Sequence, residues 1–127
     1  MKTTIAIALG AVLGAAGVTA INAQTKPPAF LVADITVTDE AKFKAWGERI
    51  GPTFPKHGGK YIARGGTVIP VTGSALTELP KRAVLVQFEN LDKAKEWDAS
   101  ADAKAAREAD GGNRGATFRT YIVEGSQ

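Results

Sequence analysis

The chain has 127 residues, 44% of them hydrophobic, with 16 basic and 13 acidic side chains, a net charge of +3 and no cysteine. Its charges are interspersed rather than gathered into a basic stripe, which argues against a nucleic-acid-binding surface. Without cysteines the chain has no disulfides, so its stability must come from packing and association.

Residues 1–23 have the composition of a secretory signal peptide. Lys2 supplies a minimal positive charge, residues 5–18 are uncharged and rich in small and aliphatic side chains, and Ile21–Ala23 is an imperfect cleavage site. A retained membrane anchor is the alternative, but the apolar segment barely reaches the roughly 20 residues that span a bilayer. We therefore expect cleavage before Gln24, a periplasmic or secreted protein, and no membrane attachment after cleavage.

The sequence predicts a short extended leader over residues 24–29 and a single domain over residues 30–125. After cleavage, about 100 residues remain, which is enough for one modest core. Removing Lys2 leaves 15 of the 16 basic side chains against 13 acidic ones, a net charge near +2. The mature protein is therefore expected to be nearly neutral.

The domain begins with a strand signal over Phe30–Val37, where β-branched and aromatic residues occur with a period of two. A helix with an aromatic face follows, and Thr38 or Asp39 is its natural N-cap. That helix is predicted to end at Gly51-Pro52, with residues 53–56 adding one irregular turn.

The stretch His57–Gly66 holds the most unusual residue choices of the chain. The only histidine and the Gly58-Gly59 pair stand at one end, and Gly65-Gly66 stands at the other. Paired glycines permit backbone angles that other residues avoid, and they let another segment approach closely. The stretch predicts a turn into a strand that starts at Lys60, with a kink or bulge soon after it.

The rest of the chain supplies the remaining elements. The sequence predicts an extended segment over 67–71, a turn at 72–74, a loop over 75–80 and a strand over 82–88. A helix capped by Asn90 or Asp92 follows, and an alanine-rich helical segment continues it over 100–109, with a possible break at Ser100. Residues 110–113 end the helix, and the last strand is predicted over 116–123.

These elements predict an α+β fold with the order strand–helix–strand–strand–helix–strand. A single antiparallel sheet with two helices on one face, the ferredoxin-like βαββαβ arrangement, satisfies that order. Right-handed crossovers then place the first and third strands in the centre of the sheet. The opposite face of such a sheet is not covered by its own helices.

Alternation along the strands predicts which residues share each face, although a shift of one residue in any strand would exchange its two sets. The helix-covered set is apolar: Leu31, Ala33, Ile35, Val37, Tyr61, Ala63, Val84, Val86, Phe88, Phe118, Thr120 and Ile122. The second set mixes aliphatic and polar groups: Val32, Asp34, Thr36, Lys60, Ile62, Arg64, Leu85, Gln87, Glu89, Arg119, Tyr121 and Val123. A mixed face of this kind is expected where a second subunit covers the sheet and leaves a lined cavity.

Several motifs together resemble the domain-of-unknown-function 1330 family: DITVTD at 34–39, the helix with an aromatic face, HGGKYIARGG at 57–66 and VLVQFENLDKAKEW at 84–97. The likeness covers residues 30–125, and the HGGKYIARGG stretch is its most specific part. The resemblance implies a dimeric α+β barrel of ferredoxin-like subunits. The superfamily includes cofactor-free monooxygenases, small isomerases and proteins with no known activity. After Ser100 the chain departs from the Pro-Glu-Tyr-like segment usual in relatives.

Two residues are candidate catalytic bases. His57 is one, because only histidine has an unperturbed pKa between about 5 and 8. Its alternative role is to hydrogen-bond the backbone at a helix-to-strand turn. Asp34 is the other, because a carboxylate inside an apolar central strand needs a partner, for which Arg64, Arg119 and Lys60 are available.

Arg64, Tyr61 and Arg119 are the candidate ligand contacts. The guanidinium of Arg64, on a strand between glycines, can hold a carboxylate ligand or pair with Asp34 across the barrel face. We expect no metal, because a single histidine and no cysteine leave only carboxylates to complete a transition-metal site. No nucleotide-binding fingerprint is present, and we expect no cofactor.

Three functions remain open from the sequence. The first is a homodimer that binds a small anionic or aromatic molecule inside its barrel. The second is a cofactor-independent enzyme, monooxygenase- or isomerase-like, with His57 or Asp34 as base and Arg64 as anchor. The third is a structural or stress-related protein without a ligand. The homodimer is expected because one uncovered sheet face leaves too little buried apolar surface in a small domain without disulfides.

Overall fold

The computed structural model describes residues 26–73 and 79–126. Its elements are β1 (Ala29–Val37), α2 (Glu40–Ile50), α3 (Thr53–Lys56), β2 (Lys60–Gly66), β3 (Arg82–Phe88), α4 (Leu91–Ala99), α5 (Ala101–Glu108), the 3₁₀ turn η2 (Ala109–Gly112) and β4 (Ala116–Glu124). This order confirms the predicted α+β class. The predicted signal peptide and most of the predicted loop at 75–80 lie outside the described residues.

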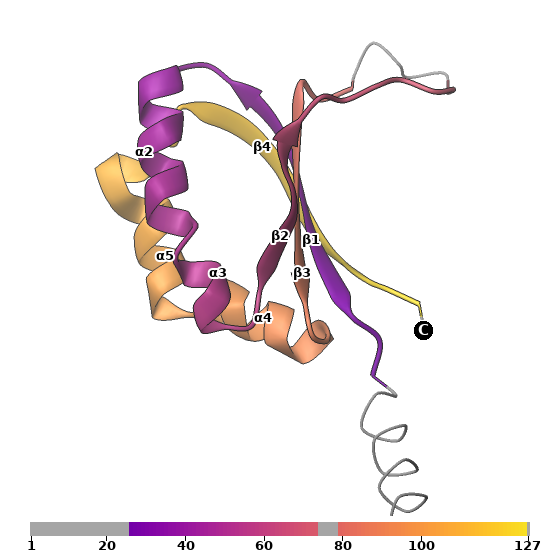
Figure 1. Ribbon diagram of the computed structural model, residues 1–127. Helices are drawn as coiled ribbons and strands as arrows, with labels where there is room; N and C mark the ends of the chain where they lie inside the picture. The colour runs from indigo at the N-terminus through magenta and orange to yellow at the C-terminus, as the bar shows by residue number, and fades with distance from the viewer. Residues whose placement is uncertain (1–25, 74–78, 127) are drawn as a thin grey trace, which may run out of the picture.

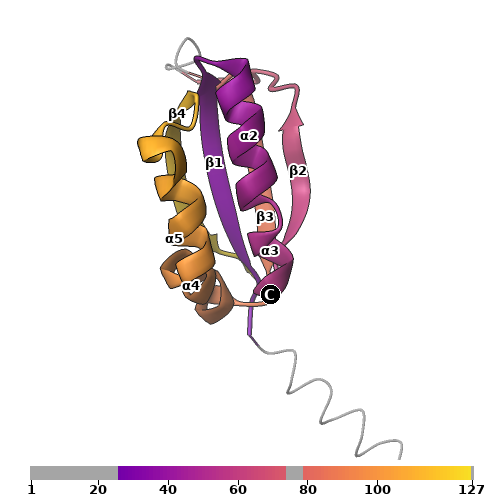
Figure 2. The ribbon, with the colours of Figure 1, turned by 90° about the vertical axis from the view of Figure 1, so that its left-hand side faces the viewer.

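The four strands form one antiparallel sheet in the order β2-β3-β1-β4. As the crossover argument predicts, the first and third strands occupy the centre. Figures 1 and 2 show α2, α3, α4 and α5 on one face of the sheet, while the opposite face is left bare by these helices. We call this second face the open face.

Side-chain caps determine where the helices begin. Asp39 accepts a hydrogen bond from the backbone N–H of Lys42 at 3.1 Å and starts α2. Asn90 does the same for α4, through the N–H of Lys93 at 3.0 Å. Ser100 both ends α4 and caps α5, which confirms a break at this residue.

The core lies at the α3–α4 end of the domain, where Phe54 and Trp97 pack on Phe88 of the sheet. Phe88 is fully buried, and burial of such a ring stabilises the fold by roughly 1.5–3 kcal/mol. Trp97 also donates a buried hydrogen bond from Nε1 to Oγ1 of Thr53 at 2.8 Å. This end of the helix–sheet interface is therefore closely packed.

The first glycine pair has two distinct structural roles. Gly58 adopts a φ of +77°, which favours glycine and makes the turn after α3. At Gly59 a Cβ atom would come within 2.8 Å of Cε1 of Phe88, so the absence of a side chain lets the turn close over the core. The turn into β2 is therefore confirmed.

Strand β2 contains two irregularities, one between Tyr61 and Ala63 and one between Arg64 and Gly66. The bulge that the glycines predict is thus confirmed, but its effect on the alternation was not anticipated. Because Arg64 pairs with Val84, and Val84 with Ala33, Arg64 lies on the helix-covered face. The predicted assignment of Arg64 to the open face was wrong. The same bulge places Ala63, which was assigned to the helix-covered face, on the open face instead.

The other strands keep their predicted faces. Leu31, Val86 and Phe88 are buried beneath the helices, whereas the paired residues Asp34 and Arg119 lie on the open face. Within residues 26–73 and 79–126, no helix is long and apolar enough to cross a membrane.

Candidate functional site

A cavity of about 700 Å³ lies between the helix-covered face of the sheet and helix α2. This volume falls within the range of about 300–1,000 Å³ that is usual for small-molecule sites. Its floor is aliphatic and comes from the central strands: Leu31, Ala33, Ile35 and Val84. The cavity is therefore formed by residues of one chain on the helix-covered face, whereas the sequence led us to expect a cavity on the other face of the sheet, between two subunits.

Two groups of aromatic side chains form the walls. The first, which we call the α2 aromatic cluster, consists of Phe43, Trp46 and Phe118, with a Trp46–Phe118 centroid separation of 4.8 Å. We call the second the α3 aromatic cluster.

The α3 aromatic cluster consists of Phe54, Tyr61 and Trp97. The ring centroid of Phe54 lies 5.0 Å from that of Trp97 and 5.3 Å from that of Tyr61, with Phe54 and Tyr61 in an edge-to-face arrangement. Rings at both ends make the cavity suitable for an apolar body, aromatic or aliphatic.

Cationic side chains surround this apolar interior. The cavity is lined by five basic residues, Lys44, Arg64, Arg82, Arg107 and Arg114, and by two acidic ones, Glu48 and Asp98. Two of the arginines have carboxylate partners: Arg82 with Glu40 at 2.8 Å, and Arg107 with Asp98 at 2.7 Å. The excess of positive charge favours an anionic ligand.

Arg64 stacks on Tyr61, with its Cζ atom 4.4 Å from the ring centroid. Among the described residues, no carboxylate lies within ion-pair distance of Arg64. Burial raises the pKa of Tyr61, and the nearby charge of Arg64 opposes that rise only in part. The phenol is therefore protonated at neutral pH and can donate a hydrogen bond.

Arg114 lies at the other side of the cavity, with Cζ 4.1 Å from the ring centroid of Phe118 and 5.9 Å from that of Trp46. Burial, followed by the charge of Arg107, lowers the pKa of Arg114. No carboxylate in the described part of the chain pairs with it at 4.0 Å or less. Sequence reasoning missed this residue.

Gly115 positions Arg114. Its carbonyl accepts hydrogen bonds from the N–H groups of Thr38 and Asp39, at 2.8 and 2.9 Å, and its φ is +66°. A Cβ atom here would lie 2.6 Å from the backbone nitrogen of Phe43. The loop before β4 is thus docked against the start of α2, and Arg114 enters between them. An Arg-Gly pair just before a strand was the only sequence signal for this arrangement.

Of the predicted contacts, Tyr61 and Arg64 line the cavity, whereas Arg119 does not. Arg119 lies on the open face beside Asp34, and donates hydrogen bonds from Nε and Nη2 to Asp34 Oδ2 at 3.0 and 2.6 Å. The expected partner of Asp34 is therefore found. The Arg64–Asp34 pair was wrong, because the bulge puts the two side chains on opposite faces of the sheet.

His57 caps the C-terminus of α3 and is outside the cavity lining. Its Nε2 lies 3.2 Å from Oδ1 of Asp102 in α5, and its Nδ1 lies 3.7 Å from Oε1 of Glu96 in α4. The side chain of Ser100, and after it His57, lowers the pKa of Asp102 to about 2. His57 therefore connects α3 to α5. It lies far from Asp34, the other candidate base, which is on the open face.

Within the described residues, no group of three His, Cys, Asp or Glu side chains could hold a metal ion. The arrangement that the structure brings together is instead an aromatic cavity with arginines at both ends. The chemistry available to it is recognition of an organic anion through charge-assisted hydrogen bonds and ring contacts.

Comparison with known proteins adds a family and a fold. A family model described as a domain of unknown function, DUF1330, matches residues 28–126. The crystal structure of the RPA0582 protein of unknown function from Rhodopseudomonas palustris superposes with a TM-score of 0.61 at 14% identity, over 80% of this chain and 85% of that chain. The crystal structure of methylated RPA0582 protein gives a TM-score of 0.61 at 13% identity, over 80% and 83%. No curated protein matches the chain.

Proposed function

Because the chain belongs to the DUF1330 family, which carries no assigned activity, we propose a function from the cavity itself: the protein binds a small organic anion with an apolar body. The observation that carries this proposal is the pairing of aromatic walls with Arg64, a lining guanidinium that has no carboxylate partner among the described residues. An aromatic or aliphatic carboxylate complements both features.

Arg64 is the proposed anchor for the carboxylate. Stacking on Tyr61 restricts the plane of its guanidinium, so less side-chain freedom is lost when a ligand binds. Its fork can donate two parallel hydrogen bonds to one carboxylate, which the ammonium of lysine cannot do. The protonated phenol of Tyr61 is a further donor at the same wall.

The enzyme alternative has less support. A general base must come within hydrogen-bond reach of the proton that it removes, and neither His57 nor Asp34 lines the cavity. The third hypothesis, a structural or stress-related protein without a ligand, also has less support, because the interior beneath α2 is open rather than packed. Binding without catalysis accounts best for the residues that the cavity collects.

We also propose that the protein is a homodimer whose subunits meet through the open face and form the dimeric α+β barrel. Tyr121 and Val123 on that face are 49% and 47% exposed, and Val32 and Leu85 lie on the same face of the two central strands. A face of this composition gains stability when a second copy covers it. Export with a cleaved signal peptide completes the proposal, on the strength of the composition of residues 1–23.

Calorimetric titration tests the binding proposal. Benzoate, phenylacetate and naphthoate are each compared with their neutral amides on the purified protein, after native mass spectrometry of the same material for co-purified ligand. We expect the acids to bind at least about tenfold more tightly than the amides, since the amides lack the charge that Arg64 recognises.

The matched variants are Arg64→Lys and Arg119→Lys. The first retains charge in the cavity but removes the planar fork, and it should weaken acid binding. The second makes the same change on the open face and should leave acid binding unchanged. Equal binding of acids and amides, or equal effects of both variants, would contradict the proposal.

A further inference from the structure

We propose that the ligand of this cavity carries two anionic groups joined by an apolar body, one held by Arg64 and the other by Arg114 together with Arg107. This inference rests on the proposed binding function and specifies its ligand class. The argument depends on where the cationic side chains lie and on which of them already have partners.

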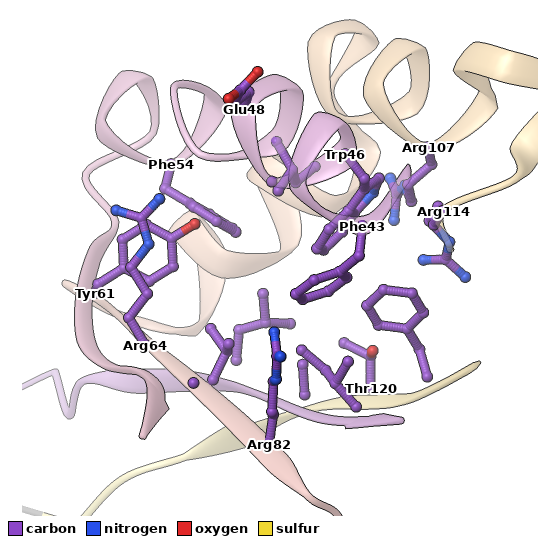
Figure 3. Close-up of a pocket in the computed structure, with 18 of the residues that line it drawn as sticks. Phe43, Trp46, Glu48, Phe54, Tyr61, Arg64, Arg82, Arg107, Arg114 and Thr120 are labelled. Atoms are coloured by element: carbon purple, nitrogen blue, oxygen red, sulfur yellow. The ribbon is translucent and has the colours of Figure 1, made fainter. Parts of the chain in front are cut away.

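The two anion positions lie on opposite sides of the cavity. Arg64 extends from β2 beside the α3 aromatic cluster, whereas Arg114 comes from the loop before β4 and lies against the α2 aromatic cluster. Figure 3 shows Arg64 and Tyr61 at one side and Arg107 and Arg114 at the other, with Phe43 between them. A ligand with one anionic group can reach only one of these positions.

Arg107 and Arg114 together form an incomplete site. Arg107 is oriented by Asp98, with Nη1 2.7 Å from Oδ1 and Nη2 2.6 Å from the backbone oxygen. Figure 3 shows Arg114 next to Arg107, and burial, followed by the charge of Arg107, lowers the pKa of Arg114. No described carboxylate lies within ion-pair distance of Arg114. A second anionic group of the ligand would relieve the repulsion between these like charges.

The charges that line the cavity agree with a dianion. The lining contains five basic and two acidic side chains, an excess of three positive charges. Glu40 lies outside the lining but pairs with Arg82, which reduces the excess to two. Glu48 points away from the interior in Figure 3. Without Glu48 the excess of positive charge is three, so a ligand with a single negative charge would leave the cavity with unbalanced positive charge.

The space between the two anion positions is apolar. Leu31, Ala33, Ile35 and Val84 form the floor, and Phe43 projects from α2 above it. A polar middle segment would lose its hydration there without gaining hydrogen bonds. The class of ligand is therefore an α,ω-dicarboxylate or an aromatic diacid with carboxylates at opposite ends.

The test compares matched diacids and monoacids by calorimetric titration of the whole protein. Adipate, suberate and sebacate are paired with hexanoate, octanoate and decanoate, and terephthalate with benzoate. We expect at least one diacid to bind about tenfold or more tightly than its monoacid, with a preference for one chain length.

Arg114→Gln should reduce the affinity for that diacid to the level of the monoacid and leave the monoacid affinity unchanged. Arg119→Gln, the same change on the open face, should affect neither. If every diacid binds no better than its monoacid in the wild type, the second anion position is wrong and the proposed function stands. If neither class binds, the proposed function itself fails. The comparison in the wild type does not depend on whether Arg114→Gln folds.

Discussion

The indole Nε1 of Trp97 donates a 2.8 Å hydrogen bond to Oγ1 of Thr53, and both side chains are buried. The Thr53 hydroxyl in turn donates to the carbonyl oxygen of Ile50 at 2.6 Å. These two bonds join α4 to the corner between α2 and α3, and α2 is the helix that covers the cavity. The corner therefore holds one wall of the cavity in place.

Thr53→Val should destabilise the protein, because the buried indole N–H of Trp97 then loses its acceptor. The expected cost is about 1–3 kcal/mol in the free energy of unfolding, measured by urea titration. Thr53→Ser, which retains the hydroxyl, should lose less. A valine variant as stable as the wild type would show that the indole finds another partner.

Gly115→Ala should destabilise the protein through its backbone and its neighbours. A left-handed φ of +66° costs a residue with a side chain about 1–3 kcal/mol, and the new Cβ would also clash with the oxygen of Asp39. Gly47→Ala is the matched control, because nothing lies within 4 Å of its Cβ position inside α2. That variant should gain about 0.5–1 kcal/mol from helix propensity.

Asp102 should make the stability depend on pH in the acid range. Its pKa is lowered from 3.8 to about 2 in the fold, so its ionised form favours the folded state above pH 4. That contribution is lost as the pH falls from about 4 to about 2. In Asp102→Asn the free energy of unfolding should therefore decline less steeply over this interval.

Carboxyl-carbon NMR checks the same residue directly. The Asp102 resonance should titrate with a midpoint near 2 in the wild type. The midpoint should be higher in His57→Gln, which removes the imidazole contact but keeps the hydrogen bond from Ser100, the larger cause of the lowered pKa. The same midpoint in both proteins would mean that the His57–Asp102 contact is absent in solution.

Val123→Glu should dissociate the proposed homodimer, since it places a charge on the half-exposed strand of the open face. Light scattering after size-exclusion chromatography should then give the mass of one chain. Ala45→Glu, the same residue on the exposed surface of α2, should leave the dimer intact. A wild-type protein with the mass of one chain would rule out the dimer.

Period-two alternation was sufficient to predict the faces of β1, β3 and β4, because each of these strands pairs in regular register. It failed in β2, where flanking glycines indicated a bulge but not its position. The irregularity between Tyr61 and Ala63 reverses the alternation before Arg64 is reached. One extra residue therefore moved the main candidate contact to the other face of the sheet.

The candidate site was predicted in part, because spacing reveals neighbours along one element and not across the fold. Tyr61 and Arg64 belong to one predicted strand and were found. Arg114 enters the cavity only because Gly115 docks against α2, and Asp102 meets His57 across 45 residues. Helical periodicity identified Trp46 as a core residue, which does not distinguish a packed interior from the wall of a cavity.

The irregular pairing of β2 also has a consequence for aggregation. β2 and β4 are the two edge strands, and each could add a strand from another molecule. Strand addition needs an uninterrupted row of backbone donors and acceptors, and the two bulges of β2 break that row. β4 offers nine regularly paired residues, from Ala116 to Glu124. Intermolecular β-pairing of the folded protein should therefore start at β4, and a proline at a non-core position of that strand should suppress it.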